Sequence, residues 1–225
     1  MALAHSPKTV TDGLVLYLDA GNPKSYPGSG TSWTSLIGNR IGTLTNGPTY
    51  SSSNGGSILF DGTNDYMSVN ISCSRTYYTL DWWARPTAVS NYDQVILMNS
   101  SGTAGSYWNG FTTHTDTSGT LYIGTTTSSR ATAGGIYTNG SWINLTWTFN
   151  NGSCNLYRNG SLVGGVSLSA HSADFTLLQI GAGPSFGEGT LFDGNCAALK
   201  LYSGKALTAA EVQQNFNALR GRFGI

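Results

Sequence analysis

The chain has few charged side chains, and the two signs cancel. Its 225 residues include 11 Lys or Arg and 11 Asp or Glu, which gives a formal net charge of zero. No basic patch can then offset phosphate charge, so we expect neither nucleic acid nor an anionic membrane as the main partner. The residues that favour coiled coils and helical bundles, Glu and Lys among them, are scarce as well, which argues against those folds.

Long apolar runs and paired cysteines are also missing. Purely apolar runs are short, as from Val95 to Met98, far below the roughly 18 residues of a membrane-spanning helix. The first residues have neither a basic region nor an apolar stretch, so we expect no secretory signal. Cys73, Cys154 and Cys196 are isolated from one another. They are interpreted as free, buried thiols in a reducing compartment.

Glycine and aromatic residues are plentiful. The chain has 30 Gly, 6 Trp, 12 Tyr and 8 Phe. That much aromatic surface argues against disorder, and abundant Gly turns between small polar and aromatic segments favour short strands in an all-β domain. The length suits one sandwich, so we expect a single domain over residues 1–225 with an N-terminal arm at residues 1–12.

Strand signals recur along the chain. From residue 142 to 166, apolar and polar side chains alternate, and Asn151-Gly152 and Asn159-Gly160 interrupt the pattern. Asn-Gly between alternating runs is the strongest short-range hairpin signal, so this segment predicts a three-stranded antiparallel meander. Further strands are predicted at Leu14–Leu18, Ser57–Phe60, Asp65–Val69, Tyr77–Arg85, Phe175–Ile180 and Cys196–Tyr202.

One helix is predicted near the C-terminus, over residues 208–220. Thr208 and Glu211 have the spacing of a capping box, and Leu207 with Val212 has the spacing of a hydrophobic staple. The apolar residues that follow recur on one helical face, so we expect a short amphipathic helix that closes a β-sandwich.

Five segments in order resemble one family. They are residues 60–66, 78–86, 141–144, 192–202 and 206–212. Together they resemble the laminin-G-like, concanavalin A-like lectin/glucanase superfamily over nearly the whole chain. The resemblance implies a jelly-roll sandwich of two antiparallel sheets, one concave and one convex, with one short C-terminal helix.

The two ends carry a narrower likeness. Residues 10–30 and 215–224 are similar to stand-alone modules in virion proteins of marine tailed phages, including those that infect cyanobacteria. This resemblance implies a virion protein assembled in the host cytoplasm, with capsid or tail proteins as partners, and we expect it to form a homo-oligomer. Phe223 and Ile225, at an apolar C-terminus, are the candidate interface residues.

Catalytic chemistry is not expected. Glucanase relatives use paired carboxylates, but the chain has only two Glu. Glu188 lies in a Gly-rich stretch, and Glu211 is assigned to the helix cap. Asp61 and Asp65 belong to a turn signal. The three His lie far apart and accompany no recognised nucleophile, so we predict a protein that is not an enzyme.

No cofactor is expected, and a structural calcium ion is doubtful. The resemblance implies calcium ligands in the last strand, but Ala197 and Ala198 stand where acidic residues are usual, which removes the hard oxygen ligands that calcium prefers. Asp19 and Asp193 remain as the candidate metal ligands.

The main functional hypothesis is therefore a virion structural protein that decorates the capsid or tail or forms a fibre-like appendage. The alternative is a lectin-like module that binds host surface glycans, because sugars stack on aromatic faces beside amides and carboxylates. Such side chains share strand faces here, although this aromatic layer could instead be packed under loops or a neighbouring subunit. The glycan-binding candidates are Asp81, Trp83, Arg85, Trp142, Asn144 and, more weakly, Trp108.

Overall fold

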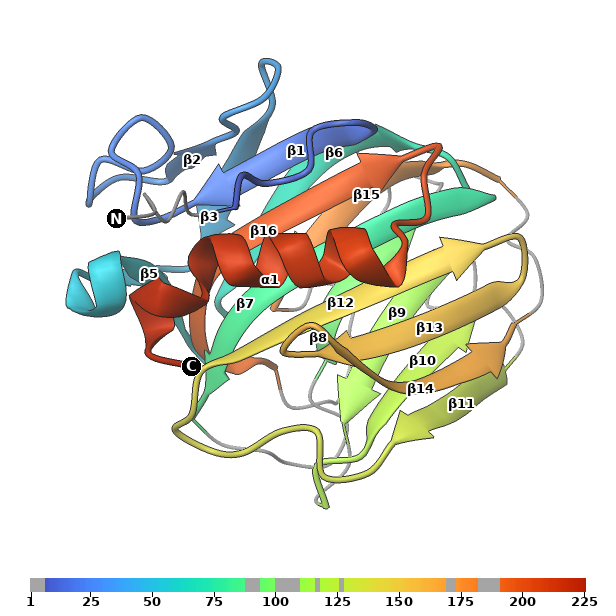
Figure 1. Ribbon diagram of the computed structural model, residues 1–225. Coiled ribbons are helices and arrows are strands. Elements are labelled where there is room, and N and C mark those ends of the chain that lie inside the picture. Colours follow the sequence, from blue (N-terminus) through green and yellow to red (C-terminus); the bar gives the residue numbers. More distant parts are fainter. Residues whose placement is uncertain are drawn as a thin grey trace, which may run out of the picture.

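The computed structural model is a sandwich of two antiparallel sheets with one α-helix (Figure 1). It describes residues 7–87, 94–99, 110–115, 118–125, 128–168, 173–181 and 191–225. The two sheets stack face to face, and the helix lies across the outer face of one of them. The all-β sandwich with a C-terminal helix that the sequence predicts is confirmed.

The first sheet carries the helix. Its strands follow the order β14-β13-β12-β7-β16-β5-β4, and β1 also pairs with β16. The strands are β1 (Leu14–Asp19), β4 (Thr49–Ser51), β5 (Ser57–Asp61), β7 (Tyr77–Pro86), β12 (Ile143–Asn150), β13 (Ser153–Arg158), β14 (Ser161–Ser167) and β16 (Asp193–Ser203). A 3₁₀ turn, Ser53–Gly55, lies between β4 and β5.

The second sheet has the order β11-β10-β9-β8-β15-β6-β3-β2. Its strands are β2 (Ser32–Thr34), β3 (Ile41–Thr45), β6 (Tyr66–Cys73), β8 (Gln94–Asn99), β9 (Gly110–Thr115), β10 (Leu121–Thr125), β11 (Ser128–Ala133) and β15 (Phe175–Ile180). The core fills the space between the two sheets, where buried side chains from both form one continuous apolar cluster.

Alternation along β7 shows why the first sheet has two different buried faces. Tyr78, Leu80 and Trp82 point into the core between the sheets. There the Tyr78 ring stacks on Phe149 with centroids 4.9 Å apart, and Trp82 stacks on Trp147 at 6.5 Å. The residues between them in sequence point the other way, toward the helix, as the period of two requires.

The predicted meander is confirmed as β12, β13 and β14. Both Asn-Gly turns have positive φ at their two central residues: 44° and 94° at Asn151 and Gly152, and 51° and 78° at Asn159 and Gly160. A type I′ turn needs that geometry, and Asn and Gly adopt it most readily. The turn residues therefore determine the register of this part of the first sheet.

Seven strands were not predicted from the sequence. They are β2, β3, β4, β8, β9, β10 and β11, and most belong to one half of the second sheet. Several are only three to six residues long and consist largely of Gly, Ser and Thr. Such segments have little hydrophobic alternation of their own and form strands because neighbouring strands pair with them.

The helix α1 spans Ala209–Phe223, three residues beyond its predicted end. Its capping box is confirmed, because the Thr208 hydroxyl accepts the Glu211 N–H at 3.3 Å and the Glu211 carboxylate accepts the Thr208 N–H at 2.9 Å. Gly224 ends the helix in the left-handed conformation, with φ of 72°. The extra turn forms because Phe223 still packs on the sheet beneath it.

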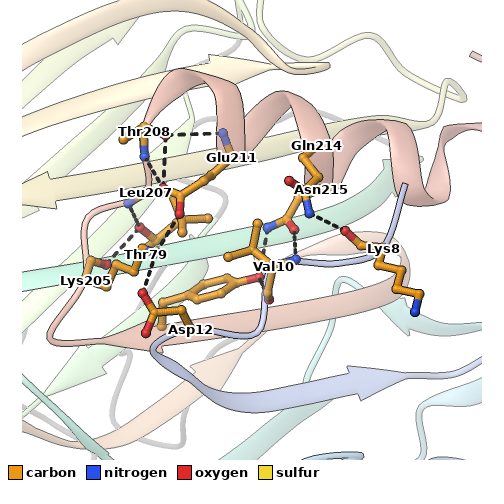
Figure 2. Close-up of polar contacts among 11 residues, drawn as sticks. Lys8, Val10, Asp12, Thr79, Lys205, Leu207, Thr208, Glu211, Gln214 and Asn215 are labelled. Atoms are coloured by element: carbon orange, nitrogen blue, oxygen red, sulfur yellow. Dashed lines mark hydrogen bonds and ion pairs between the residues drawn. The ribbon is translucent and has the colours of Figure 1, made fainter. Parts of the chain in front are cut away.

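The N-terminal arm is tied to the middle of α1 (Figure 2). The Val10 N–H donates to the Asn215 side-chain oxygen at 2.9 Å, and the Tyr202 hydroxyl donates to the Val10 carbonyl at 2.9 Å. Asn215 also donates to the Tyr202 hydroxyl, and Gln214 donates to the Lys8 carbonyl at 2.6 Å. The arm is thus held to the helix from residue 8 onward.

A second group of contacts joins the arm to the start of α1. The ammonium group of Lys205 lies 2.7 Å from the Asp12 carboxylate and 2.6 Å from the Glu211 carboxylate (Figure 2). The two carboxylates raise the pKa of Lys205, and Lys205 lowers the pKa of Glu211. Glu211 therefore takes part in both the helix cap and this ion pair. Its role in the cap agrees with the prediction from the sequence.

The three cysteines are free and buried, which confirms their interpretation as small buried side chains. Burial raises the pKa of Cys73, Cys154 and Cys196 to about 12 in each case, so the thiols stay protonated and unreactive near neutral pH. None of the helices in the described part of the chain is long and apolar enough to cross a membrane.

Candidate functional site

The outer face of the first sheet is divided between a part that α1 covers and a part that stays open. Under the helix, Trp83 has no exposed surface. Its ring stacks against Phe216 at 5.7 Å and against Phe223 at 4.4 Å. The prediction that Trp83 offers a face to a sugar is wrong, because the helix occupies that face. Phe223 is 6% exposed and packs inward, so its prediction as an interface anchor is also wrong.

Asp81 and Asn144 are buried in a polar layer between the sheet and the helix. The Asp81 carboxylate accepts a hydrogen bond from the Asn144 amide at 2.8 Å and lies 3.4 Å from the Lys200 ammonium group. All three side chains have no exposed surface. Their prediction as glycan ligands is therefore wrong. The sequence interpretation missed Lys200, which lies directly opposite Asp81 in the register of β16 and β7.

Asp19, a predicted metal ligand, pairs with an arginine instead. Arg222 lies 2.6 Å from the Asp19 carboxylate, donates to the Asn54 carbonyl at 2.8 Å and also donates to the Gly56 carbonyl. The guanidinium group thus binds the carboxylate and carbonyl oxygens that a metal ion would need as ligands. Its positive charge also disfavours a metal cation at the same place. The prediction of a metal at Asp19 is wrong, because Arg222 already satisfies this carboxylate.

Beyond the C-terminal end of α1, the outer face of the first sheet holds an open cavity of about 370 Å³. We call it the Arg85 cavity. Strands β5, β7 and β16 and the turn before β12 supply its walls, which combine charged and amide side chains with a mostly apolar lining. The lining residues are Leu59, Phe60, Asp61, Arg85, Thr87, Gly140, Asp193 and Asn195.

The register of three strands brings the polar groups of the cavity together. Asp193 lies directly opposite Asp61, and Asn195 lies opposite Arg85. Side chains that face each other across paired strands have Cβ atoms about 4.5–5.5 Å apart. The cavity thus holds two carboxylates, an amide and a guanidinium group on three neighbouring strands, with Asp61 and Arg85 two strand spacings apart. The four residues come from three segments that lie far apart in sequence, which is why alternation alone could not group them.

Asp61 is held as a carboxylate by its own turn. Its side chain accepts the backbone N–H of Thr63 at 2.8 Å and that of Asn64 at 3.3 Å. The hydrogen bond from Thr63 is the main cause that lowers the pKa of Asp61, with that from Asn64 adding to it. The turn interpretation of this segment is confirmed, and Asp61 presents a fixed, ionised acceptor at the mouth of the cavity.

Arg85 is fixed at one end and available at the other. Its Nε donates to the Gly140 carbonyl at 2.8 Å, and the Gly140 N–H donates to the Pro86 carbonyl at 2.7 Å. Within the described part of the chain, the two Nη groups of Arg85 have no acceptor. Asn195 is oriented by donation to the Ser57 hydroxyl at 3.1 Å. Both side chains therefore reach the cavity in defined orientations.

Two of the predicted site residues meet in this cavity although they were predicted for different roles. Arg85 was a glycan candidate and Asp193 a metal candidate. No group of three or more His, Cys, Asp or Glu that could hold a metal occurs among the residues the structure describes. Trp142 is partly exposed and packs on Phe223 at 4.6 Å. Ile225 is 40% exposed and stays an interface candidate. Trp108 lies outside the described residues.

Comparison with known families supports the resemblance in the sequence. The sequence pattern of the Concanavalin A-like lectin/glucanases superfamily matches residues 61–213, more than half of the chain. The matched segment includes both acidic residues and the arginine of the Arg85 cavity. No curated protein matches the sequence.

Solved structures with this fold include carbohydrate-active proteins. The chain is similar to the Trypanosoma rangeli sialidase in complex with 2,3-difluorosialic acid, with 13% identity and a TM-score of 0.71. The match covers 98% of this chain and 36% of the sialidase, so the chain spans about a third of that protein. It is also similar to domain 4 of AbnA, an extracellular arabinanase from Geobacillus stearothermophilus, in complex with arabinotriose.

That second likeness covers 90% of this chain and 97% of the arabinanase domain, with 14% identity and a TM-score of 0.66. The arabinanase domain therefore corresponds to this chain over almost its whole length, whereas only part of the sialidase does. At these identities the similarity shows a shared fold alone, and the function must be argued from the residues of the Arg85 cavity.

Proposed function

The chain belongs to the concanavalin A-like lectin/glucanases superfamily, and on that premise we propose that it is a non-catalytic module that binds a carbohydrate in the Arg85 cavity. The observation that carries the proposal is the convergence of Arg85, Asp61, Asp193 and Asn195 in one cavity of about 370 Å³. Ligand sites of proteins have volumes of about 300–1,000 Å³ and a few oriented polar groups.

The polar groups of the cavity match the chemistry of sugar hydroxyls, which donate and accept hydrogen bonds. The Nη groups of Arg85, which have no acceptor among the described residues, can donate. The carboxylates of Asp61 and Asp193 can accept, and the Asn195 amide can do both. The described lining of the cavity contains two carboxylates and one guanidinium group, so its net charge is negative. Because like charges repel, we expect neutral sugars to bind better than sialic or uronic acids.

The same geometry supports binding without hydrolysis. Glycoside hydrolysis needs one carboxylic acid whose pKa is raised, so that it can protonate the leaving group. Asp61 is exposed, and its backbone hydrogen bonds lower its pKa. Burial raises the pKa of Asp65, but Asp65 does not line the cavity and accepts the Asp61 N–H instead. Glu211 belongs to the helix cap. We therefore propose that the protein is not an enzyme and needs no cofactor.

Substitutions on the cavity wall should weaken sugar binding without unfolding the protein. We expect Asn195→Ala and Asp193→Asn each to lower the affinity for the best ligand on a glycan array by at least about tenfold. The first removes an oriented amide, and the second replaces a charged acceptor by a neutral amide. Affinities are measured by calorimetry and stability by urea unfolding. Asn70→Ala, at an exposed position on β6 of the other sheet, is the matched control and should bind normally. An array without any sugar-dependent signal would contradict the proposal.

A second proposal concerns where the module acts. We propose that it is a virion structural protein of a tailed phage, assembled in the host cytoplasm as a homo-oligomer on capsid or tail proteins, with the cavity facing host surface glycans. The narrow likeness of residues 10–30 and 215–224 to such modules supports it. These two segments meet in the fold, through Val10 and Asn215 and through Asp19 and Arg222, so the likeness concerns one contiguous structural feature.

The virion proposal predicts that the protein copurifies with particles. Mass spectrometry of density-purified virions from the phage that encodes the chain should detect it at a constant stoichiometry to the major capsid protein. Lysate treated in the same way after deletion of the capsid gene serves as the control. Absence of the protein from purified virions would contradict the virion proposal but would not affect the carbohydrate proposal.

A further inference from the structure

The turn that contributes Gly140 to the Arg85 cavity also positions an aromatic side chain next to it. Ile143, the first residue of β12, pairs with Ala84 on β7. Because the chain runs antiparallel to β7, the preceding residue, Trp142, comes beside Arg85 on the outer face of the sheet. Gly140, two residues earlier, lines the cavity itself. Trp142 therefore borders the cavity on the side away from Asp61.

Two anchors hold Trp142 in that place. On one side, Arg85 donates to the Gly140 carbonyl at 2.8 Å, and the Gly140 N–H donates to Pro86 at 2.7 Å, so the turn is bonded to β7. On the other side, the Trp142 ring packs on Phe223 with centroids 4.6 Å apart. A ligand that meets Trp142 thus finds a ring that is already oriented, which lowers the entropic cost of binding.

The accessible part of Trp142 is apolar. The residue is partly exposed, yet its Nε1 is buried and has no acceptor among the residues that the structure describes. What reaches the surface is therefore the carbon part of the ring. A carbon face beside a cluster of hydrogen-bonding groups is the combination that sugars need, because a sugar ring has an apolar C–H side and a polar hydroxyl rim.

The distance between Asp61 and Trp142 bears on the size of the ligand. The side chains that line the proposed site form a row across the sheet. The row starts at Asp61 on β5, crosses β16 and β7, and ends at Trp142 beside β12, which is three strand spacings. Strands lie about 4.8 Å apart, so the row extends over roughly 14 Å, more than one sugar ring occupies. We propose that the ligand is an oligosaccharide that lies across these strands, with one ring hydrogen-bonded in the Arg85 cavity and another ring stacked on Trp142.

This inference rests on the proposed carbohydrate binding, so its test separates the two. Calorimetry compares arabinose, glucose and galactose with arabinotriose, cellotriose, laminaritriose and galactotriose. In the unmodified protein, the trisaccharide of the preferred sugar should bind about tenfold or more tightly than its monosaccharide. Trp142→Ala should abolish that gain and leave the monosaccharide affinity within about twofold, whereas Asn195→Ala should weaken both ligands.

Two further variants guard against a merely structural effect. Trp142→Phe keeps an aromatic carbon face and should retain most of the trisaccharide gain. Tyr77→Ala removes an aromatic residue, 42% exposed, at the other end of β7 and should change neither affinity. Equal binding of mono- and trisaccharide, or an equal loss of both in Trp142→Ala, would overturn the inference while the cavity proposal stands. Binding of none of these sugars, together with a blank array, would overturn the cavity proposal itself.

Discussion

Replacement of Trp83 by alanine is expected to lower the free energy of unfolding by about 3–5 kcal/mol, the usual cost of removing a large buried aromatic side chain. Trp83 has no exposed surface and contacts two rings of α1, Phe216 and Phe223. The cavity left behind would lie between the sheet and the helix. Equilibrium urea unfolding followed by circular dichroism measures the change.

Trp83→Phe provides the control for this prediction and separates packing from sugar binding. It keeps a ring between Phe216 and Phe223, so we expect a smaller loss of stability than for alanine. Since Trp83 does not line the Arg85 cavity, Trp83→Phe should bind sugars as tightly as the unmodified protein. A stability loss below about 1 kcal/mol in Trp83→Ala would mean that the helix is not docked on this ring.

The role of Trp83 shows which part of the structure the sequence could predict. Alternation placed Trp83, Asp81 and Arg85 on one face of β7, and the structure agrees. The sequence could not tell which part of that face the helix covers. Coverage depends on how far α1 extends and where it crosses the sheet, and both depend on tertiary packing of Phe216 and Phe223. One strand face therefore holds a buried ring, a buried ion pair and an exposed arginine.

The Arg85 cavity illustrates a second limit. Asp61 was predicted as part of a turn, which its hydrogen bonds to Thr63 and Asn64 confirm. Asp193 begins β16, three residues before the predicted start of that strand at Cys196. Their meeting follows only from the pairing of β5 with β16, whose partners are separated by more than a hundred residues. Local patterns define strands and turns, whereas long-range register decides which side chains share a site. The order of the family motifs predicted the fold but gave no information on which residues of neighbouring strands pair with each other.

The buried ion pair of Asp81 and Lys200 is the other place where a single substitution should have a large effect. Its two side chains have no exposed surface and lie 3.4 Å apart on neighbouring strands. Asp81→Ala would leave the Lys200 ammonium group buried opposite no carboxylate and would also remove the nearer of the two acceptors of the Asn144 amide. Breaking a buried pair in this way costs about 3–5 kcal/mol, so we expect that loss in urea unfolding.

Replacing both partners should cost far less than the single changes suggest. In Asp81→Leu combined with Lys200→Met, no charge remains buried, and apolar side chains of similar size fill the space between β7, β16 and α1. Buried pairs replaced in this way often leave stability unchanged or raise it, because the desolvation of two charges offsets their attraction. We therefore expect the double variant to lie within about 2 kcal/mol of the unmodified protein.

A double-mutant cycle compares the stability losses of the two single variants with the loss of the double variant. This comparison depends less on how the side chains pack in any one variant. The single variants of the cycle are Asp81→Leu and Lys200→Met. If the pair acts as a unit, their two losses of about 3–5 kcal/mol each will sum to more than the double loss by about 4 kcal/mol or more. Asp81→Asn, which keeps the shape and the contact with Asn144, supplies a conservative single variant should alanine unfold the protein. Additive losses would show that Lys200 gains little from Asp81. Its ammonium group would then depend on the ring of Tyr17, whose centroid lies 5.3 Å away.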